Sequence, residues 1–163
     1  MPTITPDKIT ISQANNSSHL EEALILFREY AESLPVDLSF QNFEEELQTI
    51  DQQYQKPTGG ILLAHYNANE LAGCAAVRQF ENDIGELKRM YIRKDFRGIG
   101  LGQKLLDLSF DLAKDLGYIK IRLDTLPSMA SAIKLYQKNG FSEIEAYRFN
   151  PVEGTMYFER NLL

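Results

Sequence analysis

Three glycines at alternate positions, Gly98, Gly100 and Gly102, are the residues of this chain whose spacing points most directly to chemistry. Glycine has no Cβ, so such a loop can curl tightly and direct successive backbone N–H groups at one point. Leucines at helical spacing follow the loop, so we expect a helix to begin near Gly100 and to add the unpaired N–H groups of its first turn. The pattern predicts an anion site suited to a phosphate.

The residues around these glycines distinguish the loop from two common phosphate loops. A Walker loop has Lys and then Ser or Thr after its last glycine, whereas Gln103 and Lys104 follow Gly102 here. A dinucleotide fingerprint has glycines at offsets of two and then three, whereas both offsets here are two. Both kinds of nucleotide site are therefore disfavoured.

The remaining pattern is Arg97-x-x-Gly100-x-Gly102 between a strand end and a leucine-rich helix, and it resembles the coenzyme A pyrophosphate loop of the GNAT superfamily of N-acetyltransferases. Residues 130–141, ASAIKLYQKNGF, are similar to the second motif of that superfamily, in which a helix carrying Ala-Ile-x-Leu-Tyr ends at Gly-Phe. Together the motifs cover about 84–145 and are more specific in this order than either is alone. The resemblance implies acetyl coenzyme A as the co-substrate.

The resemblance also implies roles for individual residues. Glu86 lies eleven residues before Arg97, at the offset of a glutamate that acts as general base in well-known members of the superfamily. Tyr136 matches a tyrosine that many relatives place near the coenzyme sulfur as general acid. Coenzyme contacts, through backbone or side chain, are implied for Met90, Tyr91, Ile92, Arg97, Gly98, Ile99, Gly100, Leu101, Gly102 and Ser131, and no metal site is implied.

Each of these candidates has a structural interpretation beside the functional one. Glu86 could be a strand glutamate that faces solvent, and Tyr136 could simply pack on the sheet. Met129 departs from the superfamily pattern, because relatives commonly have an Asn there that bonds the coenzyme. Ser128 or Ser131 could replace that contact, although a helix cap or a polar surface position explains either serine equally well.

The acceptor pocket is predicted between the first two helices and the closing strands. Its candidate residues, for a cationic amine, are Phe40, Phe43, Glu44, Tyr147, Asn150 and Glu153, and a core stripe with ordinary turn residues explains the same set. The two histidines, His19 and His65, offer little material for a Ser-His-Asp or Cys-His mechanism, and His65 is interpreted as structural.

Periodicity and turn signals predict the elements that position these residues. Ser18 and Glu21 have the spacing of a capping box in front of a helix over 17–33. Further helices are expected from about 40 to 51, from Gly100 to Gly117 and from Pro127 to Gly140. Strands are expected over 8–12, 60–66, 70–79, 84–93, 119–125, 141–147 and 155–160, with the second and third joined as a hairpin. Periodicity gives only an α/β or α+β class; the resemblance implies the GNAT fold, a mixed, mostly antiparallel sheet with helices on both faces.

Length and composition bound the remaining possibilities. With 163 residues, 44% of them hydrophobic, the chain fits one domain over 1–163. No apolar run approaches the roughly 18 residues that span a bilayer, and the amino terminus lacks a signal pattern, so we expect a cytoplasmic protein without a membrane partner. Cys74 lies in a small apolar run and is interpreted as packing.

Charge argues against a nucleic-acid partner and for a local anion site. The net charge is −6, whereas nucleic-acid-binding domains are usually strongly basic. Six basic residues nevertheless gather near the glycine loop, and we expect them to favour an anionic cofactor: Lys88, Arg89, Arg93, Lys94, Arg97 and Lys104.

These observations favour an acetyl-coenzyme-A-dependent N-acetyltransferase that moves the acetyl group directly to a primary amine of a small molecule, an amino acid or a peptide, because no convincing acyl-carrying nucleophile is present. The alternative is a non-catalytic acyl-coenzyme A binding or sensing module, and a different acyl donor such as succinyl-coenzyme A is a third possibility. A monomer or homodimer is expected, because no heptad repeat or long exposed apolar edge is visible.

Overall fold

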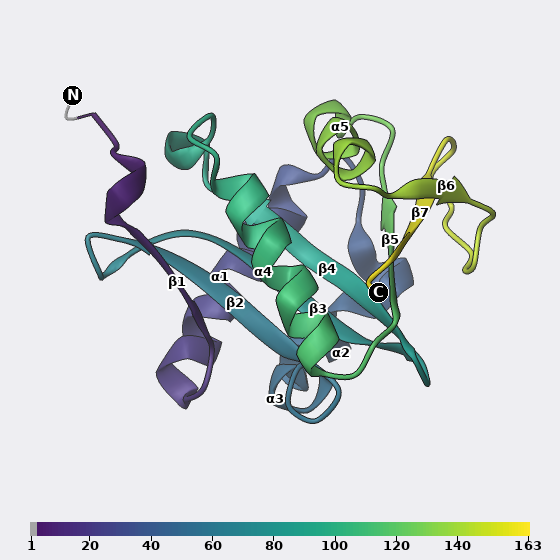
Figure 1. The fold of residues 1–163 in the computed structure, drawn as a ribbon, viewed down its shortest axis with the longest axis horizontal. Helices are drawn as coiled ribbons and strands as arrows, with labels where there is room; N and C mark the ends of the chain where they lie inside the picture. The colour runs from purple at the N-terminus through teal and green to yellow at the C-terminus, as the bar shows by residue number, and fades with distance from the viewer. Residues whose placement is uncertain (1–2) are drawn as a thin grey trace.

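The computed structural model describes residues 3–163 and contains a seven-stranded sheet in the order β1-β2-β3-β4-β5-β7-β6 (Figure 1). Neighbouring strands run antiparallel except β4 and β5, which are parallel. The strands are β1 (Ile9–Gln13), β2 (Gly60–Tyr66), β3 (Glu70–Glu81), β4 (Ile84–Ile92), β5 (Lys120–Thr125), β6 (Ser142–Ile144) and β7 (Met156–Asn161). The predicted mixed, mostly antiparallel sheet is confirmed.

Helices cover both faces of this sheet, as predicted. On one face lie α1 (Ser17–Ser33), α2 (Phe43–Gln48) and α3 (Ile50–Gln53). On the other lie α4 (Leu101–Asp115) and α5 (Ala130–Lys138). Short 3-10 turns occupy Pro6–Lys8, Leu38–Gln41 and Lys94–Phe96. Within residues 3–163, no helix combines the length and apolar character that a membrane crossing requires.

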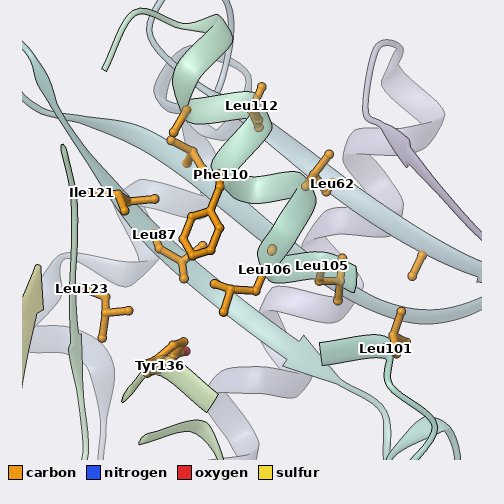
Figure 2. Packing of buried hydrophobic residues seen from close by; sticks show 14 of the residues in the cluster. Leu62, Leu87, Leu101, Leu105, Leu106, Phe110, Leu112, Ile121, Leu123 and Tyr136 are labelled. Atoms are coloured by element: carbon orange, nitrogen blue, oxygen red, sulfur yellow. The ribbon is translucent and has the colours of Figure 1, made fainter. Parts of the chain in front are cut away.

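Strand alternation divides the core into two apolar clusters. Ile61 and Leu63 of β2 pack toward α1 and α2, whereas Leu62 packs toward α4. Figure 2 shows the second cluster, in which Leu106 and Phe110 of α4 lie over side chains of β4 and β5. Most residues of β3 and β4 are buried on both faces of the sheet, so their side chains pack against the helices on either side.

Three local predictions are wrong in detail. The N-cap of α1 is Asn16, whose side-chain oxygen accepts from the His19 N–H at 2.8 Å, so Ser18 already lies inside the helix and forms no capping box. The helix expected up to 51 is broken into a 3-10 turn, α2 and α3, because the backbone leaves helical geometry at Asn42 and Thr49. The strand expected over 141–147 pairs only as β6.

The sheet opens in its middle, between β4 and β5. These two strands pair over three positions only, Ile84 to Glu86 against Lys120 to Arg122. Beyond Glu86, β4 is bent by a bulge opposite Cys74 to Ala76, and Arg89 within it has a φ of 56°. On the other side, β5 ends at Thr125, two residues before Pro127, which cannot donate to a strand ladder. The two strands therefore diverge and leave an edge of β4 inside the molecule.

Candidate active site

The glycine loop curls as predicted at two of its three glycines. Gly98 and Gly100 have φ values of 78° and 85°, and a Cβ at either position would meet nothing within 4 Å. Gly102 has another role, because it lies in the first turn of α4 and a Cβ there would come within 3.3 Å of the Ile92 Cδ1 atom. Its missing side chain lets α4 approach β4 closely.

The N-terminus of α4 faces this loop without a side-chain cap. The helix begins at Leu101, and the earliest intrahelical bond runs from the Lys104 N–H to the Gly100 carbonyl at 3.2 Å. The N–H groups of the first turn therefore point out of the helix beside two glycines that leave open space. Such a cradle can accept a phosphate group.

The basic residues near the loop divide between the two faces of the sheet. Lys94, Arg97 and Lys104 are exposed around the loop, and the Arg97 Nε donates to the Ile92 carbonyl at 2.9 Å. By contrast, Lys88 and Arg89 are 3% and 5% exposed and lie on the opposite face, so the prediction that they attract the cofactor is wrong. Local charge density in the sequence overstated the basic character of the loop.

The Arg93 side chain does not face the glycine loop either, because it is paired with Glu29 of α1. Its Nη2 and Nε contact the two carboxylate oxygens of Glu29 at 2.6 and 2.9 Å. The hydroxyl of Tyr91 donates to the same carboxylate at 3.3 Å, so the Tyr91 side chain points away from the glycine loop. Only the backbone of Tyr91 could contact the coenzyme.

The edge of β4 supplies backbone groups to the opening. The Arg93 N–H donates to the Ala72 carbonyl of β3 at 2.9 Å, so strand alternation directs the Ile92 N–H the other way, toward the gap between β4 and β5. The side chains of Met90 and Ile92 pack against the α4 cluster. The backbone of β4 is therefore available to an extended ligand, and its recognition of the coenzyme stays a prediction.

Tyr136 of α5 is buried on the α4 side of the opening (Figure 2). Burial raises the pKa of its phenol, and the Tyr30 phenol of α1 adds to that rise. Ser131 is exposed in the first turn of α5. The Met129 sulfur accepts from the Thr125 hydroxyl at 3.7 Å, so the missing Asn is replaced here by an internal contact.

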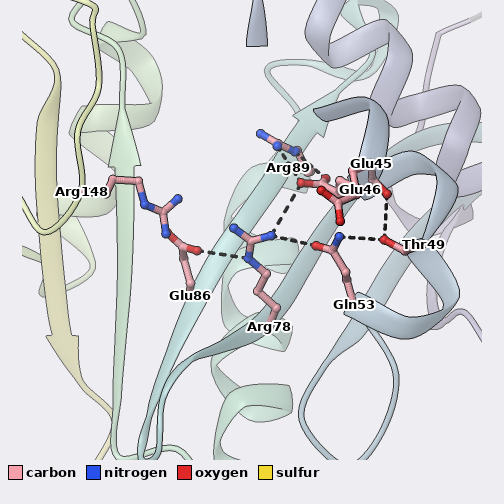
Figure 3. A network of polar contacts seen from close by, with 8 residues as sticks. All are labelled: Glu45, Glu46, Thr49, Gln53, Arg78, Glu86, Arg89 and Arg148. Atoms are coloured by element: carbon pink, nitrogen blue, oxygen red, sulfur yellow. Dashed lines mark hydrogen bonds and ion pairs between the residues drawn. The ribbon is translucent and has the colours of Figure 1, made fainter. Parts of the chain in front are cut away.

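Glu86 is fully buried at the point where β4 and β5 part, and it is surrounded by donors (Figure 3). Arg148 and Arg78 contact its two carboxylate oxygens at 2.7 and 3.2 Å, and the Tyr147 hydroxyl donates to it at 3.0 Å. Burial alone would raise the pKa of Glu86, but Lys88 and the two arginines outweigh it and hold that pKa below its usual value. Glu86 is therefore a buried anion, not a solvent-facing strand residue.

A second buried ion pair lies beside it in the same network. The Arg89 Nη2 and Nε donate to the two oxygens of Glu46 in α2 at 2.8 and 2.9 Å, and the guanidinium lies 5.2 Å from the centre of the Phe43 ring. Burial opposes the charge on Arg89, yet its bonds to Glu46 raise the pKa. Arg78 joins the two pairs, because its Nη1 lies 3.7 Å from Glu46.

Comparison with known proteins identifies the family to which this fold and site belong. The profile of the acetyltransferase (GNAT) family matches residues 24–141. The chain belongs to this family. An uncharacterised N-acetyltransferase of Schizosaccharomyces pombe is 34% identical over 93% of this chain and 94% of its own length. The N-acetylaspartate synthetase of Xenopus tropicalis is 28% identical over 67% of this chain and 41% of its own length.

Solved GNAT structures share the fold. A GNAT acetyltransferase of Staphylococcus aureus Mu50 matches with a TM-score of 0.75 and 26% identity, covering 95% of this chain and 99% of that chain. A GNAT acetyltransferase of Elizabethkingia anophelis, with a TM-score of 0.66 and 24% identity over 95% of this chain and 99% of its own, was solved with acetyl-CoA bound. As a GNAT N-acetyltransferase, the chain takes acetyl coenzyme A as its co-substrate.

The residues predicted for the acceptor pocket of this GNAT domain are only partly brought together. Asn150 lines a cavity between β4 and β5. The Tyr147 hydroxyl donates to Glu86, which lines a second cavity. Phe43 belongs to the core, and Glu44 and Glu153 are exposed. The side chain of Phe40 lies outside the described residues.

Sequence reasoning missed Arg78, Asp124 and Arg148 at this GNAT site and placed Lys88 beside the glycine loop instead. All four line the two cavities on the α1 and α2 side of the opening. For Arg78, Lys88 and Asp124 the only signal in the sequence is charge inside largely apolar strands, which is costly unless the charge is paired; Arg148 lies between β6 and β7 and has no such signal. By contrast, Cys74 is packed as predicted: its Sγ donates to the Arg89 carbonyl at 3.2 Å, and burial raises its pKa.

Proposed function

We propose that this GNAT protein transfers an acetyl group directly from acetyl coenzyme A to a primary amine of a small molecule, an amino acid or a peptide. One observation carries this proposal: the opening between β4 and β5 has the glycine cradle on one side of the sheet and a polar cavity on the other. Donor and acceptor can therefore meet at the bend of β4, and the inert packing of Cys74 supports direct transfer.

We assign the backbone of β4 and the first turn of α4 to coenzyme binding, and Tyr136 to the leaving group. Transfer breaks the thioester C–S bond, forms an amide C–N bond and leaves a thiolate that needs a proton. Burial raises the pKa of this phenol, so Tyr136 stays protonated and can donate a hydrogen bond to the departing sulfur, while the raised pKa makes complete transfer of the proton to the thiolate less favourable. Tyr136 is therefore the proposed donor to the sulfur, and Ser131 remains a candidate for an outer coenzyme contact.

Glu86 remains the predicted general base, but its contacts favour a positioning role. Both of its oxygens accept from charged groups, and its pKa is held low despite burial, which weakens it as a proton acceptor. A positioning role predicts that Glu86→Gln raises KM for the amine by disturbing Arg148 and Tyr147 while the acidic limb of the kcat profile stays in place. A base predicts that the acidic limb disappears.

The test is thiol release from acetyl coenzyme A over a panel of amines, amino acids and peptides, with coenzyme binding followed by calorimetry. We expect turnover with one acceptor class, and a reduction of kcat by about tenfold or more in Tyr136→Phe with coenzyme affinity kept. Equal kcat in Tyr136→Phe would contradict the assigned acid. Failure to bind acetyl coenzyme A would contradict the whole proposal.

The second candidate is an acyl-coenzyme A sensor without turnover, and the ion pairing of Glu86 is the observation that favours it. Tight coenzyme binding with no thiol release from any acceptor would replace the transferase by this sensor. The similarity to N-acetylaspartate synthetase instead supports a small acceptor, since that relative is named for an acetylated amino acid. We further propose a single domain over 1–163 that acts in the cytoplasm as a monomer or homodimer.

A further inference from the structure

Asp124 lies near the end of β5, where β4 and β5 diverge. Ile121 and Leu123 of the same strand belong to the core cluster under α4, so strand alternation directs the Asp124 side chain to the opposite face of the sheet, toward α1. There it lines the cavity that also includes Tyr30 and Asn150. The glycine cradle lies on the α4 side, so an acceptor that meets the coenzyme at the opening arrives from the face of this cavity.

The Asp124 carboxylate has an oxygen to which nothing donates. Its Oδ2 atom is buried and accepts no hydrogen bond from the residues that the structure describes. The ion pairs formed by those residues do not include Asp124 either. Burying a carboxylate oxygen without a donor costs free energy, so the site favours a molecule that brings an N–H or O–H group to it.

The two glutamates that flank this region, Glu46 and Glu86, are already paired. Glu46 accepts two hydrogen bonds from Arg89, and Glu86 lies between two arginines and a tyrosine hydroxyl. A carboxylate held in this way is a weak proton acceptor, because its charged form is stabilised. Among these three carboxylates, Asp124 is the one whose buried oxygen is left for an incoming group.

The cavity beside Asp124 suits the nitrogen end of an acceptor. Its volume of about 40 Å³ is room for a group the size of an ammonium. Leucine side chains form an apolar wall for the carbon atoms next to that nitrogen: Leu34, Leu38, Leu87 and Leu126. Lys88 and Arg89 line the same cavity, and positive charges disfavour a second cation beside them. The nitrogen must therefore lose a proton to react there, and Asp124 is the carboxylate in the described lining of the cavity.

We propose that Asp124 is the general base of this acetyl transfer: its Oδ2 atom accepts a hydrogen bond from the acceptor nitrogen and then a proton. This inference rests on the proposed acetyl transfer and assigns the step for which Glu86, held by two arginines, is poorly suited. Glu86 then orders Arg148 and Tyr147 beside the site. Burial favours the assignment, because it disfavours the charged forms of ammonium and carboxylate alike and so favours transfer of the proton between them.

The step balances without any further reactant. An N–H bond of the acceptor ammonium breaks, and an O–H bond forms on Asp124. The freed lone pair forms the C–N bond with the thioester carbon, and the C–S bonding pair leaves with the sulfur. As the amide forms, a second proton leaves the nitrogen and ends on the sulfur, and Asp124 releases the first proton to water.

Charged and titratable groups from four neighbouring parts of the chain face Asp124. They are Tyr30 of α1, Lys88 and Arg89 of β4, Tyr147 and Arg148 after β6, and Tyr157 of β7. Burial raises the pKa of the three phenols, so they stay neutral near pH 7. Burial lowers the pKa of Lys88 to about 7, so a pH profile must separate Lys88 from Asp124.

The dependence of kcat on pH identifies the base. The natural protein is compared with Asp124→Asn, Glu86→Gln and Lys88→Met, and with Asp111→Asn, which changes an exposed aspartate of α4 as a matched control. We expect an acidic limb in the natural protein, and Asp124→Asn should be the one variant of the four that loses it. Near neutral pH, kcat of Asp124→Asn should fall by about 100-fold or more with coenzyme affinity kept.

The loss in Asp124→Asn should also depend on the basicity of the acceptor. Phenethylamine and putrescine are almost wholly protonated near neutral pH, whereas leucinamide and glycylglycine have a substantial neutral fraction. A neutral amine has no proton to give up before it attacks, so the variant should lose about tenfold less activity with the second pair. Equal losses with all four acceptors would point to a merely structural role and overturn the inference. Urea denaturation of each variant separates a folding defect from a catalytic one.

The remaining outcomes separate this inference from the proposed transfer. An acidic limb that is absent from the natural protein, kept in Asp124→Asn or lost in Glu86→Gln would overturn the inference and leave the transferase intact. The result for Glu86→Gln decides even if Asp124→Asn does not fold, and Asp124→Glu, which keeps a carboxylate, should retain the limb. No turnover of any of the four acceptors would overturn the transferase.

Without turnover, calorimetry of phenethylamine with coenzyme-A-saturated protein still tests the site. Binding that is weakened about tenfold or more in Asp124→Asn would support the amine contact at Asp124. Equal affinities in the natural protein and the variant, or no binding to either, would overturn the inference together with the transferase.

Discussion

At the scale of single residues, the pocket is made by buried charges that hold one another in place. The Glu46 carboxylate accepts two hydrogen bonds from Arg89, and the Glu86 carboxylate contacts Arg78, Arg148 and the Tyr147 hydroxyl. Such ion pairs add little net stability, because the free energy needed to remove the charges from water is about as large as the attraction between them. The loss of one partner is more damaging than the loss of a whole pair.

Glu46→Gln should therefore destabilise the protein strongly. The substitution leaves the Arg89 guanidinium buried without the carboxylate that takes two of its bonds, and breaking a buried pair costs about 3–5 kcal/mol. Urea denaturation measures the loss of unfolding free energy. The double variant Glu46→Leu, Arg89→Met should be more stable than Glu46→Gln, and a double variant that is less stable would contradict this account.

At the scale of elements, α4 and α5 position the coenzyme side as one unit. Gln103 in the first turn of α4 and Asn139 at the end of α5 exchange two side-chain bonds, at 2.8 and 3.0 Å. Gly102 lets the same turn approach Ile92 of β4 and Leu135 of α5. The glycine cradle is thereby fixed relative to Tyr136 on the neighbouring helix.

Two glycines at opposite ends of α4 provide a matched test of the cradle. Gly100 and Gly117 have φ values of 85° and 93°, and a Cβ would meet nothing within 4 Å at either position. Glutamate at either position should therefore cost a similar strain of roughly 1–2 kcal/mol. Only Gly100→Glu should weaken acetyl coenzyme A binding, by about tenfold or more, because its carboxylate would lie where phosphates bind. Calorimetry giving equal affinities for Gly100→Glu and Gly117→Glu would rule out this cradle.

The elements themselves could be predicted from the sequence, because leucine spacing and turn residues are local signals. The pocket could not, for a physical reason visible at β4. Regular alternation would put Lys88 and Arg89 on opposite faces of the strand, but the bulge at Arg89 turns both toward α1 and α2. A positive φ at an arginine has no sequence signature. Glu86 and Tyr136 were found only because their motifs resemble a known family.

At the scale of the whole molecule, two helix layers enclose a sheet that is divided by its own opening. The chain has a net charge of −6, whereas the charged residues buried in the described part of the chain balance, with Lys88 and Arg89 against Glu46 and Glu86. The buried lysine in that interior links the site to the stability of the whole fold.

Folding stability should rise between pH 7 and about pH 10 through Lys88. Burial lowers its pKa to about 7 in the folded protein from an ordinary value of 10.5, so in this window the unfolded chain binds a proton that the folded chain lacks. Stability therefore increases with pH across this window, by at most about 1.4 kcal/mol per pH unit for one proton, and below pH 7 Lys88 is protonated in both states and adds no further change. The unfolding free energy of the natural protein should rise over this window relative to that of Lys88→Met, which has no lysine to titrate at this position. Parallel curves would contradict the assignment.

The opening between β4 and β5 also affects the tendency of the protein to aggregate through an unpaired strand edge. An unpaired strand edge on the outside of a molecule invites other chains to pair with it and is a common origin of aggregation. Here the unpaired edge from Leu87 to Ile92 lies in the middle of the sheet, between α1 on one face and α4 and α5 on the other. A slender ligand can add to this edge as an extra strand would, whereas a passing polypeptide is kept out by the helices.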